Sequence, residues 1–331
     1  MLIKMQVGEQ DRGELQVNVT DSDNAPIRDA RVTISEPETA INPNSPIERL
    51  ETDVSGQTQI VDLNTPPLEY SLNENNENMP YANYNIQIEV PGYETENIRN
   101  VEILPDSLSL QNVRMRKREG EQVENIDIDP HTLYAEYPEK IPEDEIKDVN
   151  EPGEIVLSRV VIPEYVVVHN GTPSSNARDY YVTYKDYIKN VASSEIYATW
   201  PRATIEANVL AIMSFTLNRV YTEWYRNKGY DFTITSSTAY DQKWIYGRNI
   251  FQSIDEVVDE IFDQYLSRPD VRQPILTQYC DGKRVTCPNW LSQWGSCNLG
   301  EQGFGTLEII RNYYGDDMYI NTAEQISGIP A

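Results

Sequence analysis

The sequence predicts an α+β protein in which an N-terminal β-sandwich is followed by a mixed helical and β domain. Three observations predict this class. Residues 13–116 alternate apolar and polar side chains with period two, residues 119–154 are strongly acidic, and residues 184–226 carry apolar side chains at helical spacing. A chain of 331 residues is long enough for about two domains that each bury a core. We therefore place the domains at residues 1–118 and 158–331, joined by residues 119–157.

The charge balance argues against two classes of partner. The formal net charge is -26, and phosphates are bound by Lys and Arg, so we expect neither nucleic acid nor an anionic membrane surface as a partner. No apolar run approaches the roughly 20 residues that span a bilayer, so we expect no membrane insertion. The N-terminus lacks the apolar core of a secretory signal. A carbohydrate remains compatible with the 22 Tyr and 5 Trp, because aromatic rings commonly hold sugars.

Five stretches of the N-terminal domain are expected to form strands. They are "ELQVNVTD", "ARVTISE", "QTQIVDL", "NYNIQIEV" and "NVRMRK", with turn signals such as Pro91-Gly92 between them. Short antiparallel strands at this spacing are typical of a small β-sandwich. The order "PIRDARVTI", "ETDVSGQTQIVDL", "YNIQIEVPGYE" resembles the carboxypeptidase-regulatory-like, transthyretin-like sandwich. The resemblance implies a turn at Thr52, Asp53 and Gly56 before a strand carrying Ile60 and Leu63, and a spacer or targeting domain without catalytic chemistry.

The joint between the domains differs in composition from both of them. Residues 119–154 hold thirteen acids and four prolines against Lys140 and Lys147. Too little apolar surface is available to offset ordering, so we expect a linker or a loosely ordered pro-like segment. Flexible charged segments are also where proteases find extended backbone, which leaves two interpretations open: an ordinary linker or an activation site.

The second domain is expected to begin with a strand in "SRVVIPEYVVVHNG" and to continue with helices. A helix from Tyr184 places Ile188, Val191, Ala192 and Glu195 on one face. Further helices are predicted over Arg202–Arg226, near Ile254–Tyr265 and near Thr306–Tyr314.

Glu195 is the candidate catalytic residue. A carboxyl on an apolar helix face has its charged form disfavoured, so its pKa rises and it stays protonated near neutral pH, ready to donate a proton. The alternative is a buried or interfacial salt bridge with Lys185 or Arg219.

The three cysteines, Cys280, Cys287 and Cys297, lie within 18 residues of one another. They fit reduced thiols, one local disulfide plus a free thiol, or a metal site lacking a protein ligand. The spacing lacks the paired C-x-x-C typical of structural zinc, and the chain has two His. We therefore expect no metal and no cofactor.

Two long motifs carry a resemblance for the second domain. "YKDYIKNVASSEIYATWPRATIEANVLAIMSFTLNR" resembles the opening of the SpoIID/LytB-type catalytic domain, and "LSQWGSCNLGEQGFGTLEIIRNYYGDDMYI" resembles its closing segment. Together with "IPEYVVVHNG", "TITSSTAYD" and "LTQYCDG", they are similar to SleC-type clostridial spore cortex-lytic enzymes over most of residues 160–330. The sequence departs from the SpoIID pattern at Met213-Ser214-Phe215, where that family carries Arg, Thr and an aromatic residue, and in lacking a "GHGxG" run before Ser-Gln.

The resemblance implies a peptidoglycan lytic transglycosylase that degrades spore cortex during germination. Glu195 stands at the place of the family's acid/base, which protonates the glycosidic oxygen and leaves a 1,6-anhydro-muramic acid end. It also implies a zymogen that a subtilisin-like germination protease cuts between about Glu154 and Val161. The enzyme would be located in the spore, in the cortex and coat region, and made in the mother cell without a signal peptide. The alternative is a non-catalytic spore-coat or cell-wall-binding scaffold.

Loop residues are the candidates for sugar binding, because aromatic faces with amide and hydroxyl groups suit a polysaccharide cleft. The alternative is that half of them, the tryptophans especially, are packing residues. The candidates are Tyr240, Asp241, Gln278, Tyr279, Trp290, Ser292, Gln293 and Trp294.

Overall fold

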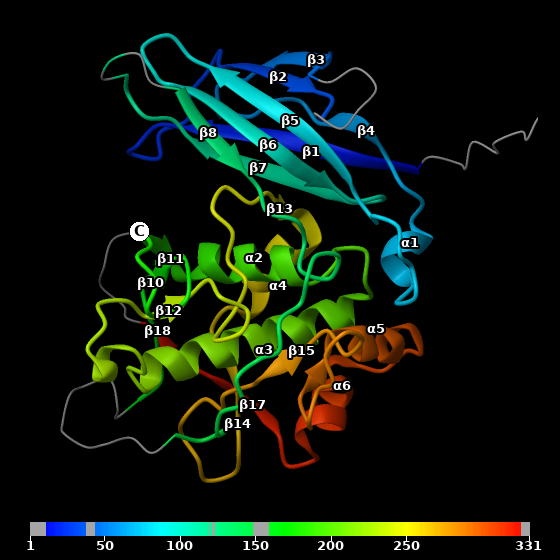
Figure 1. Cartoon of the computed structure of the whole chain (residues 1–331), viewed down its shortest axis with the longest axis vertical. Coiled ribbons are helices and arrows are strands. Elements are labelled where there is room, and N and C mark those ends of the chain that lie inside the picture. Colours follow the sequence, from blue (N-terminus) through cyan, green and yellow to red (C-terminus); the bar gives the residue numbers. More distant parts are fainter. Residues whose placement is uncertain (1–10, 38–43, 119, 121–122, 148–158, 326–331) are drawn as a thin grey trace, which may run out of the picture. The chain divides into compact units, whose positions relative to one another are not determined.

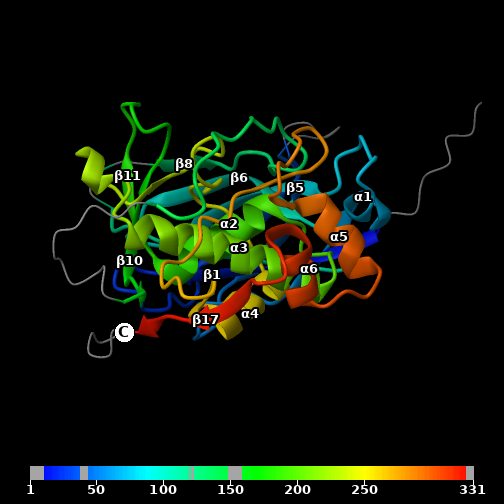
Figure 2. The same ribbon diagram turned by 90° about the horizontal axis from the view of Figure 1, so that it is seen from below.

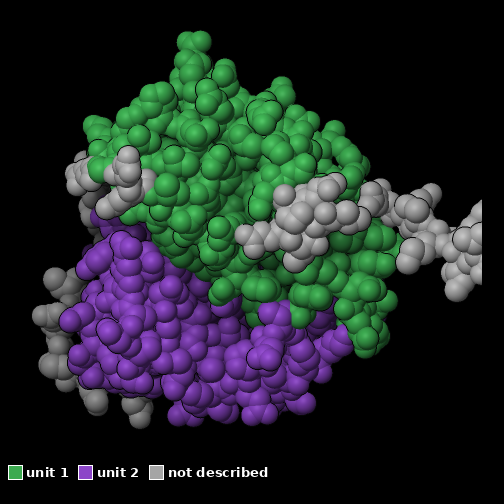
Figure 3. All heavy atoms as spheres, turned by 45° about the horizontal axis from the view of Figure 1, so that its top comes forward, with its two compact units in different colours: residues 1–134, 197–199, 245–253 green, residues 135–196, 200–244, 254–331 purple. Residues whose placement is uncertain are grey.

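The computed structural model describes residues 11–37, 44–118, 120, 123–147 and 159–325. The chain divides into two compact units, which Figure 3 shows in different colours. Strands and helices both contribute, so the predicted α+β class is confirmed. Unit 1 comprises residues 1–134, 197–199 and 245–253, and unit 2 comprises residues 135–196, 200–244 and 254–331.

Unit 1 consists of two sheets (Figure 1), with strand orders β13-β7-β1-β4 and β3-β2-β5-β6-β8. The pairs β1–β7 and β6–β8 are parallel and the other neighbours are antiparallel. A short helix, α1 (Glu69–Leu72), follows β4. The strands are β1 (Asp11–Thr20), β2 (Arg31–Ser35), β3 (Pro46–Glu51), β4 (Val61–Thr65), β5 (Ala82–Glu89), β6 (Thr95–Ile103), β7 (Leu108–Arg114), β8 (Val123–Asp127) and β13 (Ile250–Phe251).

The core of unit 1 lies between these two sheets. Leu15 and Val17 of β1 belong to the same buried cluster as Val32 and Ile34 of β2, and all four are fully buried. Burial of such a side chain stabilises the fold by roughly 1.5–3 kcal/mol. The alternation seen in the sequence therefore produces a β-sandwich. Strand β6 was not among the predicted strands, because it places carboxylates such as Glu102 at buried positions and so breaks the pattern.

A tight turn before β4 contains Thr52, Asp53 and Gly56, as expected. The Asp53 carboxylate accepts hydrogen bonds from the backbone N–H of Ser55 (2.8 Å) and Gln57 (3.1 Å). Gly56 has φ +74°, and a Cβ there would lie 2.5 Å from the Val19 carbonyl oxygen. Only glycine fits this backbone without strain. Of the two residues expected on the following strand, Leu63 is buried within β4, whereas Ile60 precedes the strand and is exposed.

The described part of the joint is more ordered than the acidic composition predicts. Residues 123–127 form β8, the fifth strand of one sheet. Residues 135–147, which we call the strap, belong to unit 2, and they bury Tyr137, Lys140 and Lys147. The charge count failed here because arginines elsewhere in the chain neutralise the acids. The expected cut between about Glu154 and Val161 falls largely on residues 154–158, outside the described residues.

Unit 2 is organised around α3 (Arg202–Tyr221), which is buried along most of its length. Helices α2, α5 and α6 and strand β14 pack on it, and Figure 2 shows α2 running alongside. No helix among the described residues is long and apolar enough to cross a bilayer. The other elements are β9 (Val161–Ile162), β10 (Tyr165–His169), β11 (Asp179–Thr183), α2 (Tyr184–Glu195), η2 (Arg226–Lys228), β12 (Ile234–Thr235), α4 (Gln252–Ile261), β14 (Gln264–Ser267), β15 (Tyr279–Cys280), β16 (Leu291–Ser292), α5 (Gln293–Glu301), α6 (Thr306–Tyr314), β17 (Tyr319–Thr322) and β18 (Glu324–Gln325).

Local chemistry sets the ends of α2. The Thr183 side chain accepts from the Asp186 N–H at the N-cap, and Ile196 is extended at the other end, so Glu195 is the last helical residue. Three details differ from the expected helices. Helix α3 ends at Tyr221, Tyr265 lies in β14 instead of in α4, and α5 was not expected. Tyr265 pairs with Asn321 of β17, a contact that local periodicity does not reveal.

Candidate active site

The Glu195 carboxyl is fully buried at the end of α2 and is held by two donors. Its Oε1 accepts from the Lys243 backbone N–H at 2.7 Å, and its Oε2 accepts from the Tyr279 hydroxyl at 2.5 Å. Burial raises the pKa of Glu195, while the nearby Lys140 ammonium and the two hydrogen bonds act in the opposite direction. A buried carboxyl with a raised pKa and fixed orientation has the properties of a general acid.

The salt bridges considered as alternatives for Glu195 are absent among the described residues. Lys185 pairs with Asp259 at 3.0 Å. Arg219 pairs instead with Glu143 at 2.6 Å and with Asp241 at 2.7 Å. Lys140 of the strap is the cation with the largest effect on the pKa of the Glu195 carboxyl, and Lys243 acts in the same direction.

Two strap side chains lie close to Glu195. The Lys140 ammonium lies 4.4 Å from the centre of the Tyr279 ring and donates to the Asp241 carbonyl at 2.7 Å. Burial lowers the pKa of Lys140, and the negative charges of Glu195 and Asp241 partly offset that effect. Burial also raises the pKa of the Tyr137 hydroxyl, with Glu195 as the next largest cause. Since Glu195 has no exposed surface, a polysaccharide cannot reach its carboxyl in this arrangement.

Hydrogen bonds hold the strap along its length. The Gln278 side-chain amide forms two hydrogen bonds with the strap backbone, accepting from the Glu143 N–H at 2.9 Å and donating to the Ile141 carbonyl at 2.8 Å. The Gln273 side-chain amide accepts from the Lys147 N–H at 2.8 Å and donates to the Lys147 carbonyl at 3.2 Å. Gln278 was predicted to bind sugar, but here both ends of its amide bind the strap.

Two charged anchors add to this backbone pairing. The Glu143 carboxylate receives Arg219 through two nitrogens, at 2.6 and 3.0 Å, and also Lys147 at 2.6 Å. The Glu145 carboxylate receives Arg268 through two nitrogens, at 2.6 and 2.8 Å. Paired geometry of this kind is among the stronger forms of ionic contact.

Asp241 is fully buried and has no exposed surface for a sugar. One carboxylate oxygen accepts from Arg219, and the other accepts from the Tyr225 hydroxyl at 2.7 Å and from the Thr235 N–H and hydroxyl at 2.9 and 2.6 Å. This saturation points to a structural role. Tyr240, its neighbour, is the more accessible of the two, with 36% of its surface exposed.

The remaining predicted loop residues occupy different environments. Trp290 is half-buried. The Ser292 hydroxyl caps α5 by accepting from the Gly295 N–H at 2.9 Å. Trp294 packs against Trp200 with ring centres 5.2 Å apart, in keeping with the packing alternative. The Gln293 side chain is fully buried, and neither atom of its amide has a hydrogen-bond partner among the described residues.

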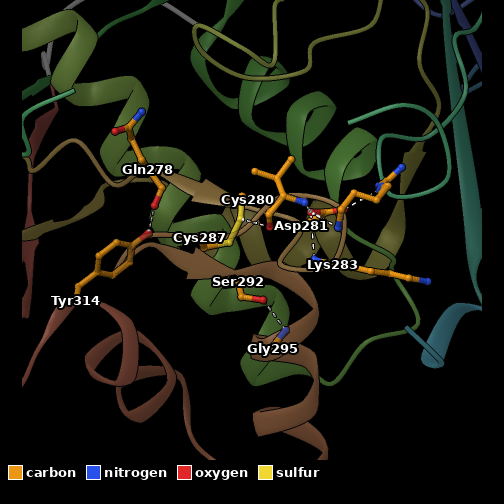
Figure 4. The surroundings of a disulfide bond; sticks show 10 residues. Gln278, Cys280, Asp281, Lys283, Cys287, Ser292, Gly295 and Tyr314 are labelled. Carbon is orange, nitrogen blue, oxygen red and sulfur yellow. Dashed lines mark hydrogen bonds and ion pairs between the residues drawn. A yellow bond between two sulfur atoms is a disulfide. The ribbon is translucent and has the colours of Figure 1, made fainter. Parts of the chain in front are cut away.

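Cys280 and Cys287 form a disulfide directly after Tyr279 (Figure 4), and Cys297 is buried and takes no part in a disulfide. The bond closes a short loop in which the buried Asp281 carboxylate accepts from Arg284 Nε at 2.7 Å and from the Val285 N–H at 3.0 Å. This is the alternative of one local disulfide plus a free thiol. The described part of the chain contains no group of three or more His, Cys, Asp or Glu that could hold a metal ion.

We expect the Cys280–Cys287 disulfide to stabilise unit 2 measurably. Replacing both cysteines by serine is expected to lower the free energy of unfolding by about 2 kcal/mol, because the short loop then gains freedom in the unfolded chain. Urea denaturation with and without reductant measures this, and reductant should not affect the double variant further. An unchanged midpoint on reduction of the unsubstituted protein would contradict the expectation.

Comparisons with known proteins do not assign the chain to a family. No family model matches, and no curated protein matches. Among solved structures, the chain is similar to Acinetobacter radioresistens catechol 1,2 dioxygenase, with 14% identity over 35% of this chain and 58% of that chain at a TM-score of 0.24. It is also similar to GBS52, a minor pilin of Streptococcus agalactiae, with 17% identity over 34% of this chain and 48% of that chain at 0.23. The matches span less than two thirds of these relatives, and likeness at this level carries no argument about function.

Proposed function

We propose that this protein is a peptidoglycan lytic transglycosylase that degrades spore cortex, with unit 2 as a SpoIID/LytB-type catalytic domain. The observation that carries the proposal is the Glu195 carboxyl, fully buried, raised in pKa and held by two donors. The motifs around it support the reaction class. Residues 1–118 are then a carboxypeptidase-regulatory-like domain of the pro-region, and the protein acts in the spore after a germination protease cuts the joint.

The proposed reaction uses Glu195 twice. The protonated carboxyl gives its proton to the glycosidic oxygen as the bond from the muramic acid anomeric carbon to that oxygen breaks. The resulting carboxylate takes the proton of the muramic acid C6 hydroxyl while the C6 oxygen bonds to the anomeric carbon. The products are a free hydroxyl on the leaving sugar and a 1,6-anhydro ring, and Glu195 ends protonated again. No water is consumed, so a second carboxylate at glycosidase spacing is not required.

The residues around Glu195 fit these two roles. The Tyr279 hydroxyl and the Lys243 N–H fix the carboxyl in one orientation and stabilise the carboxylate formed in the first step. Asp241 is committed to Arg219, Tyr225 and Thr235 and takes no part in the chemistry.

The strap accounts for how the uncut chain is kept inactive. Lys140 and Tyr137 lie beside Glu195, so the strap must leave before a glycan can enter. Part of the contact between the strap and the site is energetically unfavourable. Burial disfavours the charged form of Lys140 and lowers its pKa, and the Tyr137 hydroxyl is buried without a hydrogen-bond partner among the described residues. Buried polar groups of this kind are destabilising, which favours release once the joint is cut.

Product analysis tests the proposed reaction. Full-length protein, with a recognition sequence for a specific protease placed within residues 148–158, is cut and incubated with purified cortex. Mass spectrometry is expected to find 1,6-anhydro-muramic acid ends. Reducing muramic acid ends would make the protein a hydrolase, and no products from the cut protein would favour the scaffold alternative.

We predict that Tyr279→Phe changes the pH dependence of the cut protein. The lost hydrogen bond stabilises the carboxylate, so the pKa of Glu195 rises further and the protonated acid persists to higher pH. The alkaline limb of the pH–rate profile is therefore expected to shift upward, and the rate to fall by roughly tenfold or more through lost positioning. Tyr319→Phe is the matched control, since that hydroxyl donates to the Arg268 carbonyl at 3.2 Å. A reduced rate with no shift in the alkaline limb of the pH–rate profile would assign Tyr279 a purely structural role.

A further inference from the structure

Unit 1 contains chain from both sides of the joint. Residues 245–253, which we call the returning segment, come after the joint but belong to unit 1. Within this segment Ile250 and Phe251 form β13 and pair with Leu110 and Ser109 of β7. Phe251 is fully buried. The returning segment is therefore an edge strand of the sandwich (Figure 1), continuous with the rest of the C-terminal chain.

A buried ion pair fixes the returning segment. Arg248 donates to the Glu102 carboxylate of β6 at 2.5 Å, and the two side chains are 0% and 1% exposed. The Asn249 side chain forms two hydrogen bonds with the backbone of Glu102. It accepts from the Glu102 N–H at 3.1 Å and donates to the Glu102 carbonyl at 2.8 Å. Removing Arg248 alone, with the segment in place, would leave the Glu102 carboxylate buried without its cation, which is strongly unfavourable.

Close packing supports the same attachment. Ile245 lies in the hydrophobic core between the sheets. Gly247 has φ +77°, and a Cβ there would lie 2.5 Å from the Ile126 side chain, so the backbone passes directly against β8. Elsewhere in unit 1, Tyr197 stacks on His131 with ring centres 4.5 Å apart. This contact joins a second piece of the C-terminal chain to the part of the joint that precedes residues 148–158.

We infer that the β-sandwich holds the returning segment as a non-covalent clasp, so that the sandwich stays bound to the catalytic chain after the joint is cut. The partner that this surface fits is residues 245–253 of the same chain. The inference depends on the proposed function only in taking the joint as the place of the cut. Activation then consists of displacement of the strap from unit 2, while the sandwich remains non-covalently bound to the catalytic chain through residues 245–253.

The test separates covalent from non-covalent linkage without measuring catalysis. The protein carrying the protease site within residues 148–158 is cut to completion, as judged on a denaturing gel. Size-exclusion chromatography at low micromolar concentration is expected to give one peak at the mass of the intact chain, containing both fragments. Two separate peaks under native conditions would overturn the inference and leave the proposed reaction untouched.

Variants of the buried pair identify the clasp. Arg248→Met leaves Glu102 buried without its cation and is expected to weaken the association of the fragments on the order of 100-fold. Adding Glu102→Gln removes both charges and is expected to restore much of the affinity, which also shows that the variant chain folds. Arg99→Met is the control, because that arginine forms an exposed pair with Asp127. Unchanged association of the Arg248→Met fragments would contradict the assignment.

Discussion

Glu195→Gln is expected to abolish cortex lysis by the cut protein, with a loss on the order of 1,000-fold or more, because one carboxyl supplies both the acid and the base. Glutamine keeps the size of the side chain and an oxygen that can accept from the Lys243 N–H, but it cannot give a proton to the glycosidic oxygen. The rate of cortex clearing and the amount of anhydro ends measure the loss.

A matched substitution separates chemistry from charge. Glu301→Gln removes a carboxylate from α5, where the side chain is exposed, and is expected to leave the rate unchanged.

The dependence of folding stability on pH gives an independent test of the state of Glu195. Since the pKa of Glu195 is raised in the folded state, the fold loses stability as pH rises from the ordinary pKa of a glutamate to the raised one. Over that range Glu195→Gln should gain stability relative to the unsubstituted protein, and the gain should level off above it. A Glu195→Gln protein that clears cortex at the normal rate would exclude Glu195 as the acid.

Loosening the strap is expected to activate the uncut chain. Glu143→Ala removes the carboxylate that receives both Arg219 and Lys147, and these contacts are largely buried. Loss of a paired ionic contact of this kind should increase the population of chains with a displaced strap by roughly 10- to 100-fold, with a matching rise in the rate of the uncut protein. Cortex clearing by uncut protein, before and after cleavage, is the measurement.

The control for this prediction lies on the same strap. Glu139→Ala removes the same charge from an exposed position and is expected to leave the uncut protein inactive. After cleavage, all three proteins should reach similar rates, because the strap no longer limits access to Glu195. Equal activity of the unsubstituted protein before and after cleavage would mean that the strap does not block the site.

The placement of Glu195 could be predicted from the sequence because it follows from local periodicity. Helical spacing from Tyr184 put the carboxyl on the buried face of α2, and the structure buries it fully. Its neighbours could not be predicted in the same way. Lys140 lies 55 positions before it in the printed sequence and Tyr279 lies 84 positions after it, and the conformations that bring them together depend on tertiary packing.

The joint shows the limit of reasoning from composition. Its acids suggested loose order, yet Glu143 and Glu145 are held by Arg219 and Arg268, which lie in the second domain. Counting charges within one segment cannot find partners elsewhere in the chain. The returning segment was missed for a related reason, since two paired residues, Ile250 and Phe251, are too few to give a period-two signal.

The most direct test of the central claim is the reaction of the cut protein with cortex in water enriched in oxygen-18. A transglycosylase closes the anhydro ring with the C6 oxygen of the substrate itself, so Glu195 is expected to give 1,6-anhydro ends that contain no oxygen-18. Reducing muramic acid ends that carry one oxygen-18 from water would contradict the account, because they would show that water, and not the C6 hydroxyl, attacks the anomeric carbon.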